Sequence, residues 1–238
     1  MRHIGKFAVL GAVLAASASF AYADVINFAS TSGTVNFTGS IASGGPFSTN
    51  PNTFASNAAP VASSFVSPAG VWSPAIAGST WVSNNAGAGP GGGVIEPNGY
   101  YTYTTTLVSA AGGAYTGTFN IMADDTVAVY LGAPSTINSL SVPFILAGGI
   151  GTDAQCADNK PTCTRLDTVS WNPTLATGGN VLTFVVEQTG LASEGLDFAG
   201  SISSVTRPPG TPEPNSLILL GTGLVGAAGM FFRRRVTA

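Results

Sequence analysis

The chain has 238 residues, of which 45% are hydrophobic and only 8% charged, and its formal net charge is −3. Low charge with this apolar content argues against a disordered chain. The single histidine is His3, which excludes histidine-based catalytic triads and the commonest zinc sites from the rest of the sequence. Between Asp24 and Thr211, three basic residues stand against ten acidic ones, a net charge of −7. So few cations exclude a nucleic-acid partner.

The first 23 residues have the organisation of a signal peptide. A basic start, MRHIGK, precedes an apolar stretch from Phe7 to Ala16. The segment closes on Ala21 and Ala23, an A-x-A pattern that predicts cleavage before Asp24. An uncleaved anchor is disfavoured because the apolar stretch is too short. The sequence therefore predicts an exported protein.

Residues 24–99 are rich in Gly, Ser and Asn, with short strand-like pieces at 25–28 and 34–38 separated by turn residues. Trp72 and Trp81 lie in this part and allow two interpretations. If they are exposed, their faces form a platform on which sugar rings stack. If they are buried, they fill the core of a β-sandwich. Trp171 and the tyrosines are further candidates for such a platform.

Strand patterns become dense from Gly99 onward. Tyr and Leu alternate with Thr over 101–107, and further strands are predicted at 115–122, 126–131, 142–146, 165–170, 181–188 and 196–205. The segment 181–188 is apolar at both alternating positions, as in a central strand covered on both faces. We expect an all-β fold, an antiparallel jelly-roll-like sandwich over residues 24–210.

Two cysteines lie in one polar loop, CADNKPTC. Because an exported chain meets oxidising conditions, Cys156 and Cys163 are predicted to form a disulfide.

Asp124 and Asp125 are adjacent carboxylates at the junction of two predicted strands. Three interpretations are open for them. They cap a turn by accepting backbone N–H groups, they contribute to a calcium site, which needs several oxygen ligands, or they act in acid–base catalysis. Catalysis is the least favoured, because neighbouring side chains on extended chain diverge and make a poor acid–base pair without a third partner. Calcium is the only cofactor that the sequence suggests, and the pattern defines no metal site.

The C-terminal stretch combines three features. Pro212, Glu213 and Pro214 are followed by an uncharged run of 16 residues, Leu217 to Phe232, and then by Arg233, Arg234 and Arg235. We predict a helix over 216–232, in which the uncharged run of 16 residues alone is about 24 Å long, slightly short of the ~30 Å hydrocarbon core. The arginines would stay on the cytoplasmic side. We expect a single transmembrane helix that anchors the precursor.

In this order and position, the triplet, the apolar run and the arginines resemble the PEP-CTERM protein-sorting signal of bacterial surface proteins. The resemblance covers residues 211–238 and implies an exosortase as processing partner, with cleavage near the triplet. The segments FNIMADDTVAVYLG and NVLTFVVEQTGLASEGLDFAGSIS also resemble jelly-roll modules with a galactose-binding-like fold.

The leading hypothesis is a non-enzymatic protein sorted to the cell surface or to the exopolysaccharide matrix of a biofilm, as the resemblance to the sorting signal implies. The alternative is a carbohydrate-binding module, with exopolysaccharide as partner. A glycoside hydrolase that uses paired carboxylates is the least favoured class. Glu187 and Glu194 are the residues with which to test it.

Overall fold

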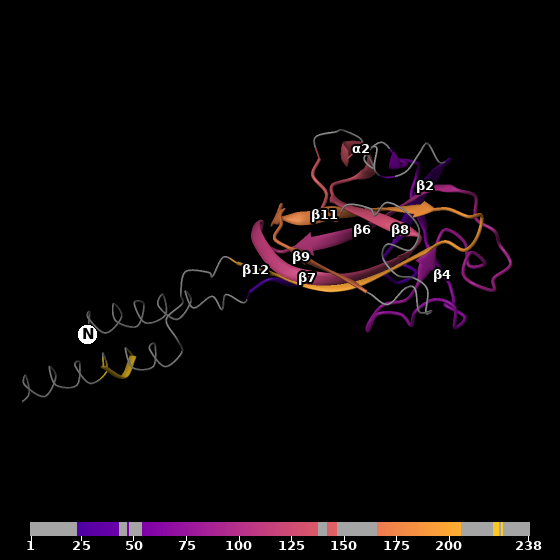
Figure 1. Cartoon of the computed structure of the whole chain (residues 1–238). Helices are drawn as coiled ribbons and strands as arrows, with labels where there is room; N and C mark the ends of the chain where they lie inside the picture. Colours follow the sequence, from indigo (N-terminus) through magenta and orange to yellow (C-terminus); the bar gives the residue numbers. More distant parts are fainter. Residues whose placement is uncertain are drawn as a thin grey trace, which may run out of the picture. The chain divides into compact units, whose positions relative to one another are not determined.

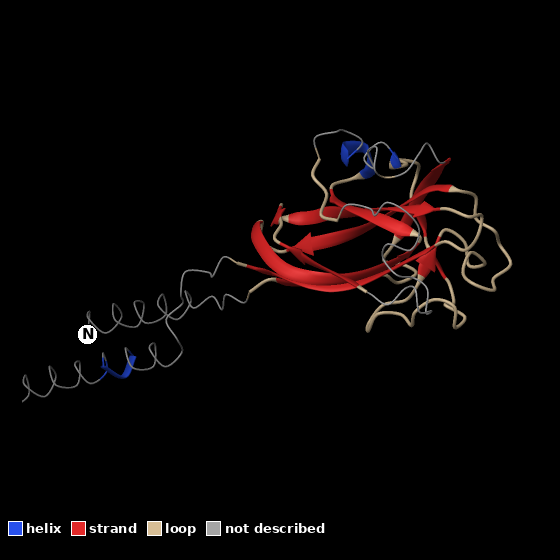
Figure 2. Cartoon of the chain, viewed as in Figure 1, coloured by secondary structure: helices blue, strands red, loops and turns tan. Residues whose placement is uncertain are grey.

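The computed structural model describes residues 23–42, 47, 54–137, 142–146, 166–205, 221–223 and 225 (Figure 1). The chain divides into two compact units, of which one is Asp24–Val205 and the other combines Met1–Ala23 with Thr206–Ala238. The first unit begins at the residue that follows the predicted signal peptide. In its described part the α-helix is a single turn, α2 (Pro134–Ile137), and strands dominate (Figure 2).

Two antiparallel sheets build this unit. The seven-stranded sheet has the order β10 (Thr174–Leu175), β7 (Gly113–Asp124), β12 (Gly195–Ser204), β5 (Val82–Ser83), β4 (Ser64–Phe65), with β1 (Val25–Ala29) also paired to β12 and β9 (Asp167–Trp171) to β7. The five-stranded sheet has the order β3 (Val61–Ala62), β2 (Asn36–Ala42), β6 (Gly99–Ser109), β11 (Gly178–Gln188), β8 (Thr126–Leu131). The prediction of an all-β antiparallel sandwich is confirmed.

The strand that looked central in the sequence is central in the structure. β11 pairs with β6 over its whole length and with β8 on its other side. Phe184 lies in the cluster between the sheets, whereas Val185 lies in a second cluster on the outer face. Apolar residues at both alternating positions are therefore explained by cover on both faces of the strand.

The two strands flanking Asp124 and Asp125 belong to different sheets. β7 ends at Asp124 in the seven-stranded sheet, and β8 begins at Thr126 in the five-stranded sheet. The chain thus crosses from one sheet to the other at this point, so these strands do not form a hairpin with each other.

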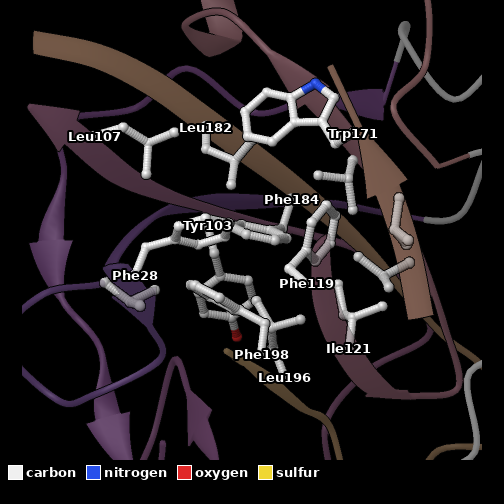
Figure 3. Close-up of a cluster of buried hydrophobic side chains, with 14 of the residues drawn as sticks. Phe28, Tyr103, Leu107, Phe119, Ile121, Trp171, Leu182, Phe184, Leu196 and Phe198 are labelled. Atoms are coloured by element: carbon white, nitrogen blue, oxygen red, sulfur yellow. The ribbon is translucent and has the colours of Figure 1, made fainter. Parts of the chain in front are cut away.

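Aromatic side chains from both sheets fill the space between them (Figure 3). The rings of Phe184 on β11 and Phe198 on β12 stack with centroids 4.3 Å apart and join the sheets directly. Phe28, Phe119 and Trp171 form a group of ring contacts beside them. Burial of each such side chain contributes about 1.5–3 kcal/mol to folding.

Segments from the Gly-, Ser- and Asn-rich part of the chain cover the outer faces. Phe54 stacks on Tyr100 of β6 with centroids 4.0 Å apart, on the outer face of the five-stranded sheet. On the seven-stranded sheet, Trp72 and Trp81 cover Met122 of β7. Low sequence complexity therefore coexists here with packing against both sheets.

The terminal unit is described only in small part. Residues 221–223 and 225 are helical. Among the described residues no helix is long and apolar enough to span a membrane. The transmembrane helix predicted for 216–232 lies mostly outside the described residues and stays a prediction.

Candidate functional site

The tryptophans proposed as a sugar platform are not accessible. Trp72 is 1% exposed and Trp81 is 0% exposed. Their ring centroids are 4.5 Å apart, and the Nε1 atom of Trp81 donates to the carbonyl oxygen of Ser73 at 3.0 Å. Trp171 is buried in the core between the sheets. The prediction of a glycan platform at Trp72 and Trp81 is therefore wrong, because no aromatic face is left for a ligand.

A glycine makes room for this tryptophan pair. A Cβ atom added to Gly195, at the start of β12, would lie 2.6 Å from Cη2 of Trp72. The indole ring thus packs directly on the backbone of the last strand. This contact fixes the covering loop to the sheet.

The adjacent carboxylates bind to separate parts of the structure. Oδ2 of Asp124 accepts the indole N–H of Trp72 at 2.8 Å. Oδ2 of Asp125 accepts both the backbone N–H of Thr189 at 2.5 Å and its hydroxyl at 2.6 Å. Among the described residues no group of three acidic, His or Cys side chains could hold a metal ion. Only Asp125 accepts a backbone N–H group, as the turn interpretation predicts, whereas Asp124 accepts the indole N–H of a tryptophan. Both carboxylates thus make structural hydrogen bonds to separate segments, which favours a structural role over a calcium site.

Several predicted site residues lie outside the described residues: Ala21, Cys156, Cys163, Pro212, Glu213, Pro214, Arg233, Arg234 and Arg235. Ala23 is described and exposed. The next residue, Asp24, is already tied into the fold. Its Oδ2 atom accepts the backbone N–H of Ala110 at 2.8 Å and the hydroxyl of Tyr115 at 2.5 Å. These hydrogen bonds lower the pKa of the Asp24 carboxyl, and the bond from Tyr115 has the largest effect.

One end of the sandwich interior holds an acidic cluster that the sequence did not reveal. Glu194 is fully buried, and its Oε2 atom accepts the hydroxyls of Ser83 at 2.6 Å and Tyr103 at 2.7 Å. Glu96 is 5% exposed and accepts the hydroxyl of Tyr101 at 3.2 Å. Burial, and then the charge of Glu96, raise the pKa of Glu194 to about 8.

Two polar groups at this end have no partner within the described part of the chain. They are Oε1 of Glu194 and both amide atoms of Gln188, the last residue of β11. Both residues are fully buried. The cluster can stabilise or destabilise the fold, depending on its protonation, but it offers no surface to a ligand.

A second buried acid organises the loop that precedes β5. Asp197 of β12 is fully buried and accepts three hydrogen bonds: from the backbone N–H of Ile76 at 2.8 Å, from the hydroxyl of Ser79 at 2.5 Å and from the hydroxyl of Ser30 at 2.8 Å. Burial raises the pKa of this carboxyl, and the hydrogen bonds oppose the rise. The carboxylate holds the loop at 76–79 against the sheet.

This loop forms one wall of a groove on the outer face of the seven-stranded sheet. The groove has a volume of about 500 Å³, with Ile76, Ala77 and Gly78 on its wall. The polar side chains that line it come from three strands, namely Asn27 of β1, Thr118 and Asn120 of β7, and Ser201 of β12. None of the described residues that line it is ionisable.

The polar surface continues past the groove onto β9. Asn120 accepts the hydroxyl of Thr168 at 2.8 Å, and Asn172 accepts the hydroxyl of Thr116 at 2.5 Å. In the sequence these residues alternate with core residues, but only the strand register brings them onto one face.

Comparison with known proteins locates the sorting signal. Residues 210–235 match the PEP-CTERM protein-sorting motif. The match covers the Pro-Glu-Pro triplet, the apolar run and the arginines, and so confirms the resemblance seen in the sequence. The chain therefore carries the sorting signal of proteins that an exosortase processes. No curated protein sequence matches the chain.

Several solved structures are similar at low identity. A family 35 carbohydrate-binding module from Clostridium thermocellum is 10% identical, with a TM-score of 0.34, and the alignment covers 75% of this chain and 98% of the module. A family 35 module from an environmental isolate is 15% identical, with a TM-score of 0.30, over 62% of this chain and 95% of that one. A Podospora anserina GH26-CBM35 β-(1,4)-mannanase is 19% identical, with a TM-score of 0.27, over 48% of this chain and 24% of that one.

Proposed function

We propose that the protein is an exported, non-enzymatic β-sandwich that is sorted to the bacterial cell surface or to an exopolysaccharide matrix. The match of residues 210–235 to the PEP-CTERM motif carries this proposal. The predicted signal peptide at 1–23 supplies export, and the predicted helix at 216–232 holds the precursor in the membrane until an exosortase cleaves near Pro212–Pro214.

The division of the chain supports this order of events. The folded unit ends at Val205, before the matched motif begins at residue 210. It has its own core between two sheets, built only from residues after Asp24. Removal of either terminal segment would leave the described strands, β1 to β12, intact.

The positions of the acidic side chains support a non-enzymatic role. Glycoside hydrolysis needs two carboxyl groups that flank one cleft, roughly 5–10 Å apart. Glu194 is fully buried among Ser83 and Tyr103 inside the sandwich. Glu187 is also buried, and it accepts the hydroxyl of Tyr100, which lies in the outer cluster of the five-stranded sheet. The two carboxylates thus lie on opposite faces of the five-stranded sheet. None of the described residues that line the groove is ionisable.

Carbohydrate binding is the second candidate function. The observation that favours it is the uncharged groove floored by Asn27, Thr118, Asn120 and Ser201. Such side chains offer both donors and acceptors to sugar hydroxyls.

Intact-mass measurement on fractions of the producing cells tests the proposed function. We expect the surface or released form to start at Asp24 and to end at or before Pro214. The variant Pro212→Ala/Pro214→Ala should accumulate as an unprocessed membrane-bound precursor. The matched control Pro208→Ala/Pro209→Ala changes two prolines just outside the motif and should be processed normally. A released form that retains Leu217–Ala238 would overturn the proposal.

A further inference from the structure

The outer face of the seven-stranded sheet carries a row of uncharged polar side chains. Asn27 of β1 lies opposite Ser201 of β12, which lies opposite Thr118 of β7. Thr118 in turn lies opposite Ser170 of β9. All four residues are exposed. Neighbouring strands are about 4.8 Å apart, so the row presents hydroxyl and amide groups across roughly 14 Å.

The neighbouring row gives this face an apolar component. Ala29 lies opposite Ala199, and Ala199 opposite Asn120. Together with Gly200, the two alanines line the groove, and their small side chains leave it open above the sheet. Ile76 and Ala77 add apolar atoms on the wall. A ligand here meets hydrogen-bonding groups along one row and C–H surface along the next.

The wall of the groove is fixed before any ligand arrives. Asp197 holds it through the backbone N–H of Ile76 and the hydroxyl of Ser79. A preformed site binds with a smaller loss of conformational entropy than one that must be ordered by its ligand. These hydrogen bonds distinguish the groove from an ordinary exposed strand face.

The electrostatics of the groove select an uncharged occupant. Its described lining has no cation to pair with a carboxylate or phosphate. The carboxylate of Asp197 lies behind the wall, and the chain between Asp24 and Thr211 has a net charge of −7. An anionic polysaccharide would therefore be repelled, and a nucleic acid even more so. Paired donors and acceptors on Asn, Ser and Thr match the hydroxyls of a neutral sugar.

We propose that this groove binds a stretch of an uncharged, linear polysaccharide, laid across β1, β12 and β7. The inference rests on the proposed role in an exopolysaccharide matrix and names the ligand class of that role. Contacts are hydrogen bonds to Asn27, Thr118 and Ser201 and apolar contacts to the alanine row. Among the described residues that line the groove, the two aromatic side chains are buried and offer no face for stacking. Each contact is therefore weak, so binding depends on several adjacent sugar units.

The test uses the processed protein as the producing cells release it, in affinity electrophoresis and calorimetry. The uncharged probes are dextran, a linear mannan and a β-glucan, and the anionic probes are alginate and polygalacturonate. We expect binding to at least one uncharged probe and none to the anionic ones. The double variant Asn27→Leu/Thr118→Val keeps the side-chain shapes but removes two hydrogen-bonding groups, and it should bind about tenfold more weakly.

The control is Thr106→Val, which repeats the Thr-to-Val half of the double variant at an exposed position of β6 in the other sheet. It should bind like the unmodified protein. The proposal is overturned if no uncharged probe binds, if the anionic probes bind more tightly, or if the double variant binds as well as the control. It is also overturned if the protein dimerises and the double variant dissociates the dimer, because a second copy is then the occupant. Normal processing with no polysaccharide binding would refute this inference alone, whereas failed processing would refute the sorting role.

Discussion

Glu194 gives the sharpest test of the energetics of this fold. The side chain is fully buried just before β12, where Oε2 accepts two hydroxyls and Oε1 has no partner within the described residues. Loss of water around the charged form is the largest cause that raises its pKa, from 4.5 to about 8, and the charge of Glu96 adds to it. Between these two pH values the Glu194 carboxyl thus keeps its proton in the folded protein and loses it in the unfolded chain.

This difference makes stability depend on pH. Below pH 4.5 both states hold the proton, and the stabilisation due to Glu194 is fully present. Between pH 4.5 and about 8 the unfolded chain binds fewer protons, so the free energy of unfolding falls as the pH rises. The difference between the two pKa values of Glu194 lowers the free energy of unfolding by about 5 kcal/mol over this pH range, at 1.36 kcal/mol per pKa unit. Glu187 and Asp197 also have raised pKa values and act in the same direction.

The variant Glu194→Gln isolates this contribution, because the amide keeps an oxygen that accepts from Ser83 and Tyr103 but carries no charge. We expect it to match the unmodified protein at pH 4–5 and to be more stable at pH 8–9, by up to about 5 kcal/mol. Urea unfolding followed by tryptophan fluorescence between pH 4 and 9 measures the difference. Asp167→Asn, the same chemical change at a partly exposed position on β9, is the control. Equal pH slopes for Glu194→Gln and the unmodified protein would refute the reasoning.

Two further predictions concern Trp72 in the loop that covers the seven-stranded sheet, and a third concerns Asp124 and Asp125. Trp72→Ala should destabilise the fold by about 3–5 kcal/mol in urea unfolding. Trp72→Phe, which keeps a ring but loses the N–H donated to Asp124, should destabilise it less; equal losses would contradict the packing explanation. Gly195→Ala should cost about 1–3 kcal/mol, since its Cβ would lie 2.6 Å from the Trp72 ring, and an unchanged midpoint would show that the ring moves freely. Because Asp124 and Asp125 bind separate loops, a chelator should leave the melting temperature unchanged, and a fall that millimolar calcium restores would revive the metal interpretation.

The strands were predictable where the pattern is local. Alternation over 101–107 falls within β6, and the predicted pieces 126–131 and 196–205 correspond to β8 and β12 within a residue. Such runs carry their own signal, because one face of each strand must be apolar. Which strands pair with each other is not encoded in any local pattern. The sequence therefore did not show that the chain crosses from one sheet to the other at Asp124.

The site could be predicted only in part. Trp72 and Trp81 lie in a segment without periodicity, and their burial depends on Met122 and Gly195, which are distant in the sequence. Glu194 lies in the polar stretch ASEG and looks like a surface residue, but hydroxyls from β5 and β6 enclose it. The groove combines residues from three strands far apart in the chain. By contrast, the sorting motif is contiguous and was recognised from the sequence.

The pairing of β12 has a mechanical consequence for a protein held by its C-terminal end. Ser204 donates its backbone N–H to Asp24 at 2.9 Å, so both ends of the folded unit leave from the same place. β12 is bonded along its length to β7, from Gly195 opposite Asp124 to Ser204 opposite Tyr115. A force applied at Val205, against a ligand bound to this sheet, would act along β12. The hydrogen bonds of β12 lie perpendicular to the strand and so to this force. The bonds are then loaded together in shear and not broken one after another, so we expect the fold to resist tension applied at Val205.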